Sequence, residues 1–506
     1  MNRETKRIPA IILALTLCLS GITGIIALEN PQIPQSTGDE QNPAKAAITK
    51  LLKTPIGTDV SRLSFMFTVT PDSVDGVAYD YDTPNMPTVN DIVMNDFHSL
   101  DTYTGEAMDA FYTRYIYKEK TINFIGDWPH AGVYEYTIYE LLSSNAIERG
   151  HDELVYSGAQ YKLRVYVRQN EAGAGYYPEI ITAERVLDDD SRLVSVKVDP
   201  TPGGPRGDYG DGDGDGNDDD NDVSNNYSQM VFTNKYMRTN GSTVPDEPKL
   251  PTELPKAALE IKKMIAGGYA NSEDYFTFKI KLTQPALVSE LYRDDDADDD
   301  EDDDIEITLG SGGLLGLLGF RRASATGLYL DVTLRFRGYV VDADGTTILG
   351  AAELQDLAKN NVTATVATDK NGRAYIVFPS GTETELNLKA GQKLVFFNTP
   401  VGTKYVAEET GKTGYVPSYQ IKYGTNENAG SATGALNSGL STANNPQAKA
   451  FVGEPDSKAN FTNTRNDITP TGLNLNDLPF IGMIVLAGLG IAGYFVAKSR
   501  RGKKHR

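Results

Sequence analysis

The sequence predicts an all-β fold made of two tandem β-sandwich domains, and three observations support that prediction. Short runs rich in Val, Ile, Thr and aromatic residues alternate between apolar and polar positions, which is the period of a half-buried strand. Glycine and proline break these runs often, as turns between strands require. Helical periodicity is scarce, so short strands packed face to face are favoured over a helical or mixed fold.

Several runs along the chain have the composition or alternation of strands. In the first domain the expected strands are residues 63–69, 133–139, 161–167, 192–198 and 230–234. In the second domain they are residues 275–282, 328–341, 374–378, 393–398 and 459–463. One segment, residues 351–359, has the spacing of a short helix.

Shifts in composition mark the domain boundaries. Residues 28–44 are rich in Pro, Gln and Asn without a period, which indicates a linker. Residues 241–256 contain four prolines among charged residues, which predicts an extended connection between two domains. We therefore expect a first domain at residues 45–240 and a second at residues 257–467.

Residues 1–27 have the pattern of a secretory signal peptide, with a basic start followed by an apolar stretch. The single cysteine of the chain, Cys18, lies inside this segment, and Leu17 before it is larger than a lipoprotein signal requires. The exported protein is therefore expected to have no disulfide, although its compartment permits disulfides. The net charge of −21 argues against nucleic acid or an anionic membrane as a partner.

Residues 468–506 predict a sorting segment for the cell surface. Residues 478–497 are mostly apolar and long enough to cross a bilayer, and the basic tail after them indicates a cytoplasmic end. Pro470, Thr471 and Gly472 stand shortly before this span, and the combination resembles a Gram-positive sortase signal that is cut between the threonine and the glycine. The motif departs from the commonest Leu-Pro-x-Thr-Gly form. A permanent tail anchor is the alternative.

Two segments, residues 208–222 and 294–304, are strongly acidic and predict surface loops. In the first, Asp211, Asp213 and Asp215 alternate before a glycine, as at the start of a calcium loop, and this pattern is compatible with weak calcium binding. No helical pattern flanks these aspartates, so a solvated, self-repelling loop is the simpler interpretation. We assign no metal site from the sequence.

Two distant parts of the chain share an unusual set of residues: a lysine within an apolar run, then a glutamate, then an asparagine two positions after a phenylalanine. The two sets are Lys50, Glu140 and Asn234, and Lys263, Glu408 and Asn463. Because side chains alternate along a strand, each lysine shares a face with the apolar residues two positions before and after it. Both lysines are therefore expected inside a core, where an amine is costly to bury. In the second set Lys262 and Glu409 are alternatives, and alternation disfavours Lys262.

Burial predicts a chemical role for each member of these sets. It lowers the pKa of the lysine and leaves a neutral, nucleophilic amine, and it raises the pKa of the glutamate so that the carboxyl group stays protonated. The carboxylic acid can donate a hydrogen bond to the asparagine carbonyl oxygen and relay protons to departing ammonia. The expected product is an intramolecular Lys–Asn isopeptide bond, formed once per site without a cofactor or enzymatic turnover. A snorkelling lysine and turn-capping polar residues are the alternative interpretation.

The residues around these sets resemble a known family. The segments GVYEYTIYE, QYKLRVYVRQNE and VFTNK, and later ALEIKKMI, DYFTFKIKL, VGTKYVAEE and ANFTNTRN, are similar to those of Gram-positive backbone pilin subunits of the streptococcal two-domain type. The resemblance implies tandem immunoglobulin-like (CnaB-type) sandwiches, each cross-linked between its first and last strands. By that similarity the bonded pairs are Lys50 with Asn234 and Lys263 with Asn463, and the catalytic glutamates are Glu140 and Glu408.

The expected function is that of a structural subunit of a covalently polymerised pilus at the cell surface. Its expected partners are a sortase transpeptidase, copies of itself or other pilins, and peptidoglycan; a host-surface ligand is a further candidate. Lys197, predicted to be exposed, is the candidate acceptor that joins one subunit to the next, and its rivals are Lys53, Lys118, Lys120 and Lys162. A singly anchored adhesin or pilus-base protein is the alternative. An extracellular enzyme is disfavoured, because the chain has no nucleophile elbow and no HExxH motif.

Overall fold

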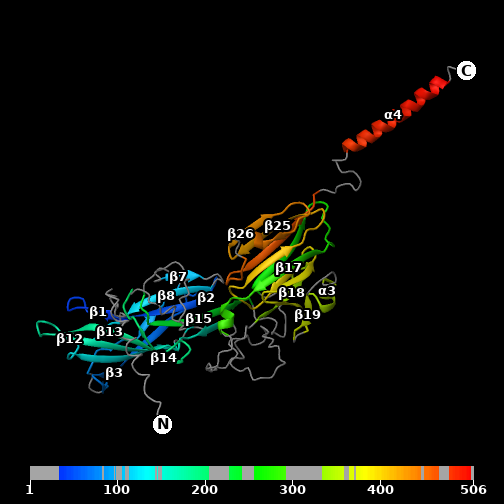
Figure 1. Ribbon diagram of the computed structural model, residues 1–506. Coiled ribbons are helices and arrows are strands. Elements are labelled where there is room, and N and C mark those ends of the chain that lie inside the picture. The colour runs from blue at the N-terminus through cyan, green and yellow to red at the C-terminus, as the bar shows by residue number, and fades with distance from the viewer. Residues whose placement is uncertain are drawn as a thin grey trace, which may run out of the picture.

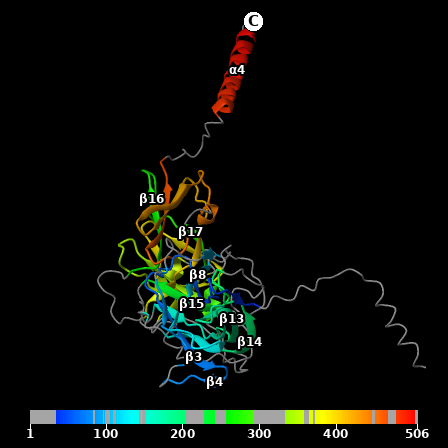
Figure 2. The same cartoon turned by 90° about the vertical axis from the view of Figure 1, so that its left-hand side faces the viewer.

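The computed structural model describes residues 34–81, 85–95, 97, 105–108, 113–142, 145, 151–203, 227–241, 256–291, 333–357, 364–369, 372–445, 450–466 and 478–502. Within these ranges the chain is mostly β, and its strands form two β-sandwiches that lie end to end (Figure 1). Helix α4 (Leu478–Gly502) stands clear of both sandwiches, also in the view from the side of the first sandwich (Figure 2). Each sandwich has its own cluster of buried apolar side chains.

The first sandwich packs two sheets against each other. One sheet has the order β1 (Ser36–Thr37), β13 (Tyr176–Leu187), β12 (Gln160–Gln169), β10 (Gly132–Leu141), β3 (Phe65–Val74) and β4 (Val77–Ala78), with β14 (Leu193–Val198) beside β13 and β6 (Ile92–Met94) beside β3. The other has the order β11 (Asp152–Val155), β15 (Val231–Asn240), β2 (Ala47–Pro55), β8 (Thr113–Thr121) and β7 (Gly105–Met108). A short ribbon pairs β5 (Thr88–Val89) with β9 (Phe124–Ile125). Alternate residues of β10, among them Tyr134, Tyr136 and Ile138, are buried in the core, as the period of two predicts.

The second sandwich has the same two-layer design. Its larger sheet has the order β19 (Thr365–Thr368), β20 (Ala374–Pro379), β18 (Arg335–Val341), β22 (Lys393–Phe396), β16 (Leu259–Ala266), β28 (Ser457–Thr464), β25 (Val416–Tyr423) and β26 (Asn426–Thr433). Its smaller sheet has the order β21 (Glu383–Leu388), β17 (Phe276–Thr283), β24 (Lys404–Glu409) and β27 (Leu440–Ser441). Short helical segments α2 (Leu287–Leu291), α3 (Ala351–Leu357) and η2 (Thr442–Asn444) lie between strands.

In each sandwich the first long strand and the last strand lie side by side and run parallel. Strand β2 pairs with β15, and β16 pairs with β28. Strand β2 is buried along its whole length, because Leu51 on its other face packs with Tyr117, Tyr227 and Val231. Parallel neighbours cannot be joined by a tight hairpin. The rest of each sandwich therefore separates the two strands in the sequence.

The last strand of the first sandwich also contacts the second sandwich. The end of β15 pairs with β23 (Thr399–Pro400). Thr239 Oγ1 donates to Asn398 Oδ1 at 2.6 Å, and the Asp59 backbone N–H donates to Glu454 at 2.7 Å. The two sandwiches are thus joined by polar contacts where β15 leaves the first core.

Strands occur in each of the predicted runs, and several extend beyond the predicted limits. Of the run predicted at residues 328–341, residues 328–332 lie outside the described ranges and strand β18 covers Arg335–Val341. The run at residues 63–69 continues as β3 to Val74, and the run at residues 230–234 continues as β15 to Asn240. The helix predicted at residues 351–359 corresponds to α3. Helix α2 was not predicted, because its 5 residues are too few to show an apolar repeat.

Several predictions concern residues outside the described ranges. The signal peptide at 1–27 and the acidic segments 208–222 and 294–304 are among them. The segment 478–497, predicted to span a membrane, lies within α4. Among the described residues, none of the helices combines the length and apolarity needed to cross a membrane.

Candidate functional site

Lys50, Glu140 and Asn234 meet inside the first sandwich. Lys50 on β2 and Asn234 on β15 come from one sheet, and Glu140 on β10 comes from the facing sheet. Lys50 Nζ lies 2.9 Å from Glu140 Oε2 and 3.1 Å from Oε1, and Asn234 Nδ2 donates to Oε1 at 2.7 Å. All three residues are buried, and Lys50 and Asn234 have 0% exposure. The structure therefore brings together the three residues of the first predicted set.

Aromatic rings pack around this first cluster. Lys50 Nζ lies 4.5 Å from the centre of the Phe65 ring, and Phe232 packs on Phe67 with ring centres 4.9 Å apart. Loss of hydration lowers the pKa of Lys50 to about 8 and raises the pKa of Glu140, although the attraction between the two charges opposes both shifts. Both shifts favour the uncharged amine and the uncharged carboxylic acid.

The second sandwich holds a cluster of the same composition, built from Lys263, Glu409 and Asn463. Lys263 on β16 and Asn463 on β28 share one sheet, and Glu409 on β24 comes from the facing sheet. Lys263 Nζ donates to Glu409 Oε2 at 3.0 Å and lies 4.0 Å from the centre of the Phe276 ring, and Asn463 Nδ2 donates to Glu409 Oε1. Burial lowers the pKa of Lys263 to about 8 and raises the pKa of Glu409.

The glutamate of the second cluster is Glu409, which corrects the prediction of Glu408. Along β24, Tyr405, Ala407 and Glu409 are buried, whereas the positions between them, Glu408 included, are partly exposed. Because side chains alternate in a strand, Glu408 points away from the face that meets Lys263. The alternation that identified the lysine, applied to the apolar Tyr405 and Ala407, identifies Glu409 as well.

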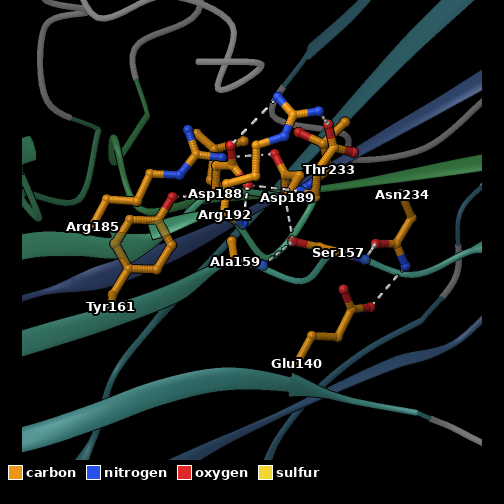
Figure 3. A network of polar contacts seen from close by, with 12 residues as sticks. Glu140, Ser157, Ala159, Tyr161, Arg185, Asp188, Asp189, Arg192, Thr233 and Asn234 are labelled. Atoms are coloured by element: carbon orange, nitrogen blue, oxygen red, sulfur yellow. Dashed lines mark hydrogen bonds and ion pairs between the residues drawn. The ribbon is translucent and has the colours of Figure 1, made fainter. Parts of the chain in front are cut away.

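The amide of Asn234 has a defined orientation. Its Oδ1 accepts a hydrogen bond from the backbone N–H of Ser157 at 2.7 Å, and its Nδ2 donates to Glu140 (Figure 3). A backbone N–H can only donate, so the amide oxygen must be the atom that faces Ser157. The expectation that the glutamic acid donates to the carbonyl oxygen is therefore wrong for this cluster. Sequence reasoning missed Ser157, because a backbone N–H leaves no signal in a residue pattern.

Lys197 lies on β14 and is exposed, as its position in the strand predicts. Val198 beside it is buried, and Val194 and Val196 are half-buried on the face opposite Lys197. The rival lysines are either buried or engaged by backbone carbonyls and carboxylates: Lys53, Lys118, Lys120 and Lys162. Lys197 is therefore exposed, as is its rival Lys120, whose amine contacts the Val93 carbonyl oxygen.

Two predicted sets of site residues lie outside the described ranges. One is the sortase motif, with Pro470, Thr471 and Gly472, and the other is the aspartate set Asp211, Asp213 and Asp215. Within the described ranges, no group of three or more His, Cys, Asp or Glu side chains is arranged to hold a metal ion. Lys197 and the two Lys–Glu–Asn clusters are thus the predicted site residues that have a described geometry.

Comparison with solved structures finds streptococcal pilins. The major pilin from Streptococcus pyogenes aligns with 14% identity and a TM-score of 0.27, over 84% of this chain and 100% of that chain. A major pilin from another serotype of the same species aligns with 15% identity and a TM-score of 0.24, over 83% and 98%. A pilus-presented adhesin aligns with 12% identity and a TM-score of 0.19, over 83% and 99%. No protein-family model and no curated protein matches the sequence.

Proposed function

We propose that this protein is the shaft subunit of a covalently polymerised, sortase-assembled pilus on a Gram-positive cell surface, stabilised by two Lys–Asn isopeptide bonds. The observation that carries the proposal is the same buried Lys–Glu–Asn cluster in both sandwiches, each between the first long strand and the last strand. Folding stability does not explain this arrangement, because a buried ion pair often stabilises a protein no more than apolar residues of similar volume do.

The contacts support a self-catalysed condensation at each site. The neutral lysine amine attacks asparagine Cγ, and the carbonyl electron pair moves to Oδ1. The glutamate gives its proton to Nδ2 and takes one from Nζ, so the Cγ–Nδ2 bond breaks and ammonia leaves. One amide replaces another, and the balance needs no oxidant or cofactor. Fixed orientation within a dry core lowers the barrier, as in other intramolecular reactions.

A bond between the first and last strands gives each sandwich a mechanical role. Force that enters a shaft subunit near one end of the chain and leaves near the other would otherwise separate these strands. A covalent tie carries that load in place of the hydrogen-bond ladders. Each tie closes a loop of roughly 200 residues, which a loop-entropy model values at about 5 kcal/mol of stability.

Assembly requires signals from the sequence and an accessible amine. The sortase motif at Thr471 and Gly472 would supply the acyl donor. Lys197, exposed on β14, is the proposed acceptor on the next subunit. An accessible lysine amine can attack the sortase thioester and form the amide that joins two subunits.

Intact mass spectrometry tests the intramolecular bonds. The full-length chain, purified in detergent, should have a mass that is short of its encoded mass by two ammonia molecules. A mass equal to the encoded chain would show that neither bond forms. Digestion then identifies the cross-linked peptides that contain Lys50 with Asn234 and Lys263 with Asn463.

Polymer analysis tests the shaft role separately. Cell-wall extracts from the producing bacterium, boiled in detergent and probed with antibody to this protein, should show a ladder of high-mass species. A single wall-linked species would contradict the shaft role and favour a singly anchored adhesin or pilus-base protein.

A further inference from the structure

Ser157 and Asp189 form a polar network beside the first cluster. Ser157 lies in the connection between β11 and β12, and Asp189 follows β13. Ser157 Oγ donates to Asp189 Oδ1 (Figure 3). The Gly158 N–H donates to the main-chain carbonyl of Asp189 at 2.7 Å. The loop that carries Ser157 is therefore held to Asp189 through both side chain and backbone.

The same carboxylate holds the strand that carries Asn234. The Thr233 N–H donates to Asp189 Oδ1 at 2.9 Å. One carboxylate oxygen thus binds both Ser157, whose N–H contacts the Asn234 amide, and the residue directly before Asn234. Arg185 Nη2 donates to Asp189 Oδ2 at 2.9 Å and compensates the charge of this largely buried group.

The second cluster differs at one atom. Asn463 Oδ1 is buried and has no hydrogen-bond partner among the residues that the structure describes, although Nδ2 of the same amide contacts Glu409. Negative charge develops on Oδ1 when an amine adds to Cγ, and a fixed N–H at hydrogen-bond distance stabilises that charge. The two clusters are therefore unequal at the atom where this stabilisation acts.

We infer that the Ser157 backbone N–H is an oxyanion donor for the condensation of Lys50 with Asn234, and that Asp189 is the positioning residue that holds it in place. This inference rests on the proposed function. When the Nζ–Cγ bond forms, the carbonyl pair moves to Oδ1 and is held by the Ser157 N–H. When ammonia leaves, the electron pair on Oδ1 re-forms the carbonyl bond. Glu140 has by then given its proton to Nδ2 and taken one from Nζ. The first link therefore forms faster than the second, and its rate depends on Asp189.

The test follows both links while the full-length chain matures. The chain is made by cell-free translation in detergent, samples are quenched in denaturant at intervals, and the two cross-linked peptides are quantified by mass spectrometry. The second link serves as the reference within the same molecule. The purified products are also compared by the fluorescence of Trp128, the single tryptophan of the chain, which packs on Tyr134 in the first core and reports whether that core has formed.

Three variants separate positioning from general damage. Asp189→Ala removes the carboxylate, and Asp189→Asn keeps a side-chain oxygen that can accept from Ser157 and Thr233. Asp188→Asn is the control in the same turn, because Asp188 Oδ1 accepts from the Asp190 and Arg192 backbone N–H groups at 3.0 and 2.7 Å.

We expect Asp189→Ala to slow the first link on the order of 100-fold, the usual effect of losing one oxyanion donor. The second link and the Trp128 emission should stay at wild-type values, Asp189→Asn should recover most of the lost rate, and Asp188→Asn should behave as wild type. A first link that forms at the wild-type rate in Asp189→Ala, or an equal slowing of both links, would overturn the inference. A wild-type chain that forms neither link would instead refute the proposed function.

Discussion

Lys263 on β16 lies opposite Phe461 on the parallel strand β28, two residues before Asn463 on the same face of that strand. Lys50 has the same relationship to Phe232 on β15, two residues before Asn234. Each lysine therefore reaches its asparagine along the diagonal of a parallel pair, with a phenylalanine as its direct neighbour. The facing sheet supplies the glutamate in both cases. The same register in both sandwiches indicates that the Lys, Glu and Asn residues are arranged in the same way at both sites. Three of the four tests below concern this arrangement, and the fourth concerns assembly.

Glu409, and not its neighbour Glu408, is expected to be required for the second link. Glu409→Gln keeps the shape of the side chain but cannot relay a proton, so the cross-linked peptide of the second sandwich should be absent. Glu408→Gln is the matched control, because Glu408 lies on the other face of β24. Peptide mapping by mass spectrometry reads both variants, with the first link as the internal reference. A second link that survives Glu409→Gln would contradict the assignment.

Loss of the second link should lower the stability of the second sandwich. Asn463→Ala removes the amide and leaves Lys263 paired with Glu409, so no buried charge is stranded. The loop-entropy model sets the expected loss at about 5 kcal/mol in the free energy of unfolding. Thermal and urea unfolding measure it. Asn460→Ala, on the partly exposed face of the same strand, should stay close to wild type, and equal effects of the two variants would count against the bond.

The rate of link formation should have a maximum with pH. The pKa of Lys50 is lowered to about 8 and that of Glu140 is raised, and the two groups titrate as a coupled pair. Below the raised pKa of the carboxyl group the pair holds an extra proton, so the amine stays an ammonium and cannot attack. Above pH about 8 the pair has lost the proton that must go to the leaving nitrogen. Initial rates of the first link, measured from acidic to alkaline buffers, check this; a rate that keeps rising above that pH would exclude the relay.

Lys197 is expected to be required for polymer but not for export or for the internal links. Lys197→Arg keeps the positive charge, yet a guanidinium stays protonated and cannot resolve a thioester. The ladder in cell-wall extracts should disappear while monomer remains at the surface. Lys162→Arg is the control, because Lys162 is already paired with Glu135 at 3.5 Å on the same sheet. Ladders that persist in Lys197→Arg would transfer the role to another amine.

Local patterns in the sequence were enough to identify most of the fold and most of both clusters. Strand periodicity places side chains on alternate faces whatever the tertiary structure. It therefore predicted that Lys263, and not Lys262, is buried. It also predicted that each asparagine points into the core on the same face as the phenylalanine two residues before it. The same rule, applied to Tyr405 and Ala407, would also have selected Glu409. These features depend on residues close together in the chain, which is why they could be predicted.

Only the tertiary structure decided which groups surround the reacting amides. The N–H that faces Asn234 belongs to a loop residue, Ser157, and the carboxylate that holds that loop, Asp189, comes from another part of the chain. Every residue but proline has a backbone N–H, so its use at one site has no signature in composition or spacing. Contacts of this kind arise when two sheets and their loops pack together, and for that reason the difference between Asn234 and Asn463 is visible only in the folded protein.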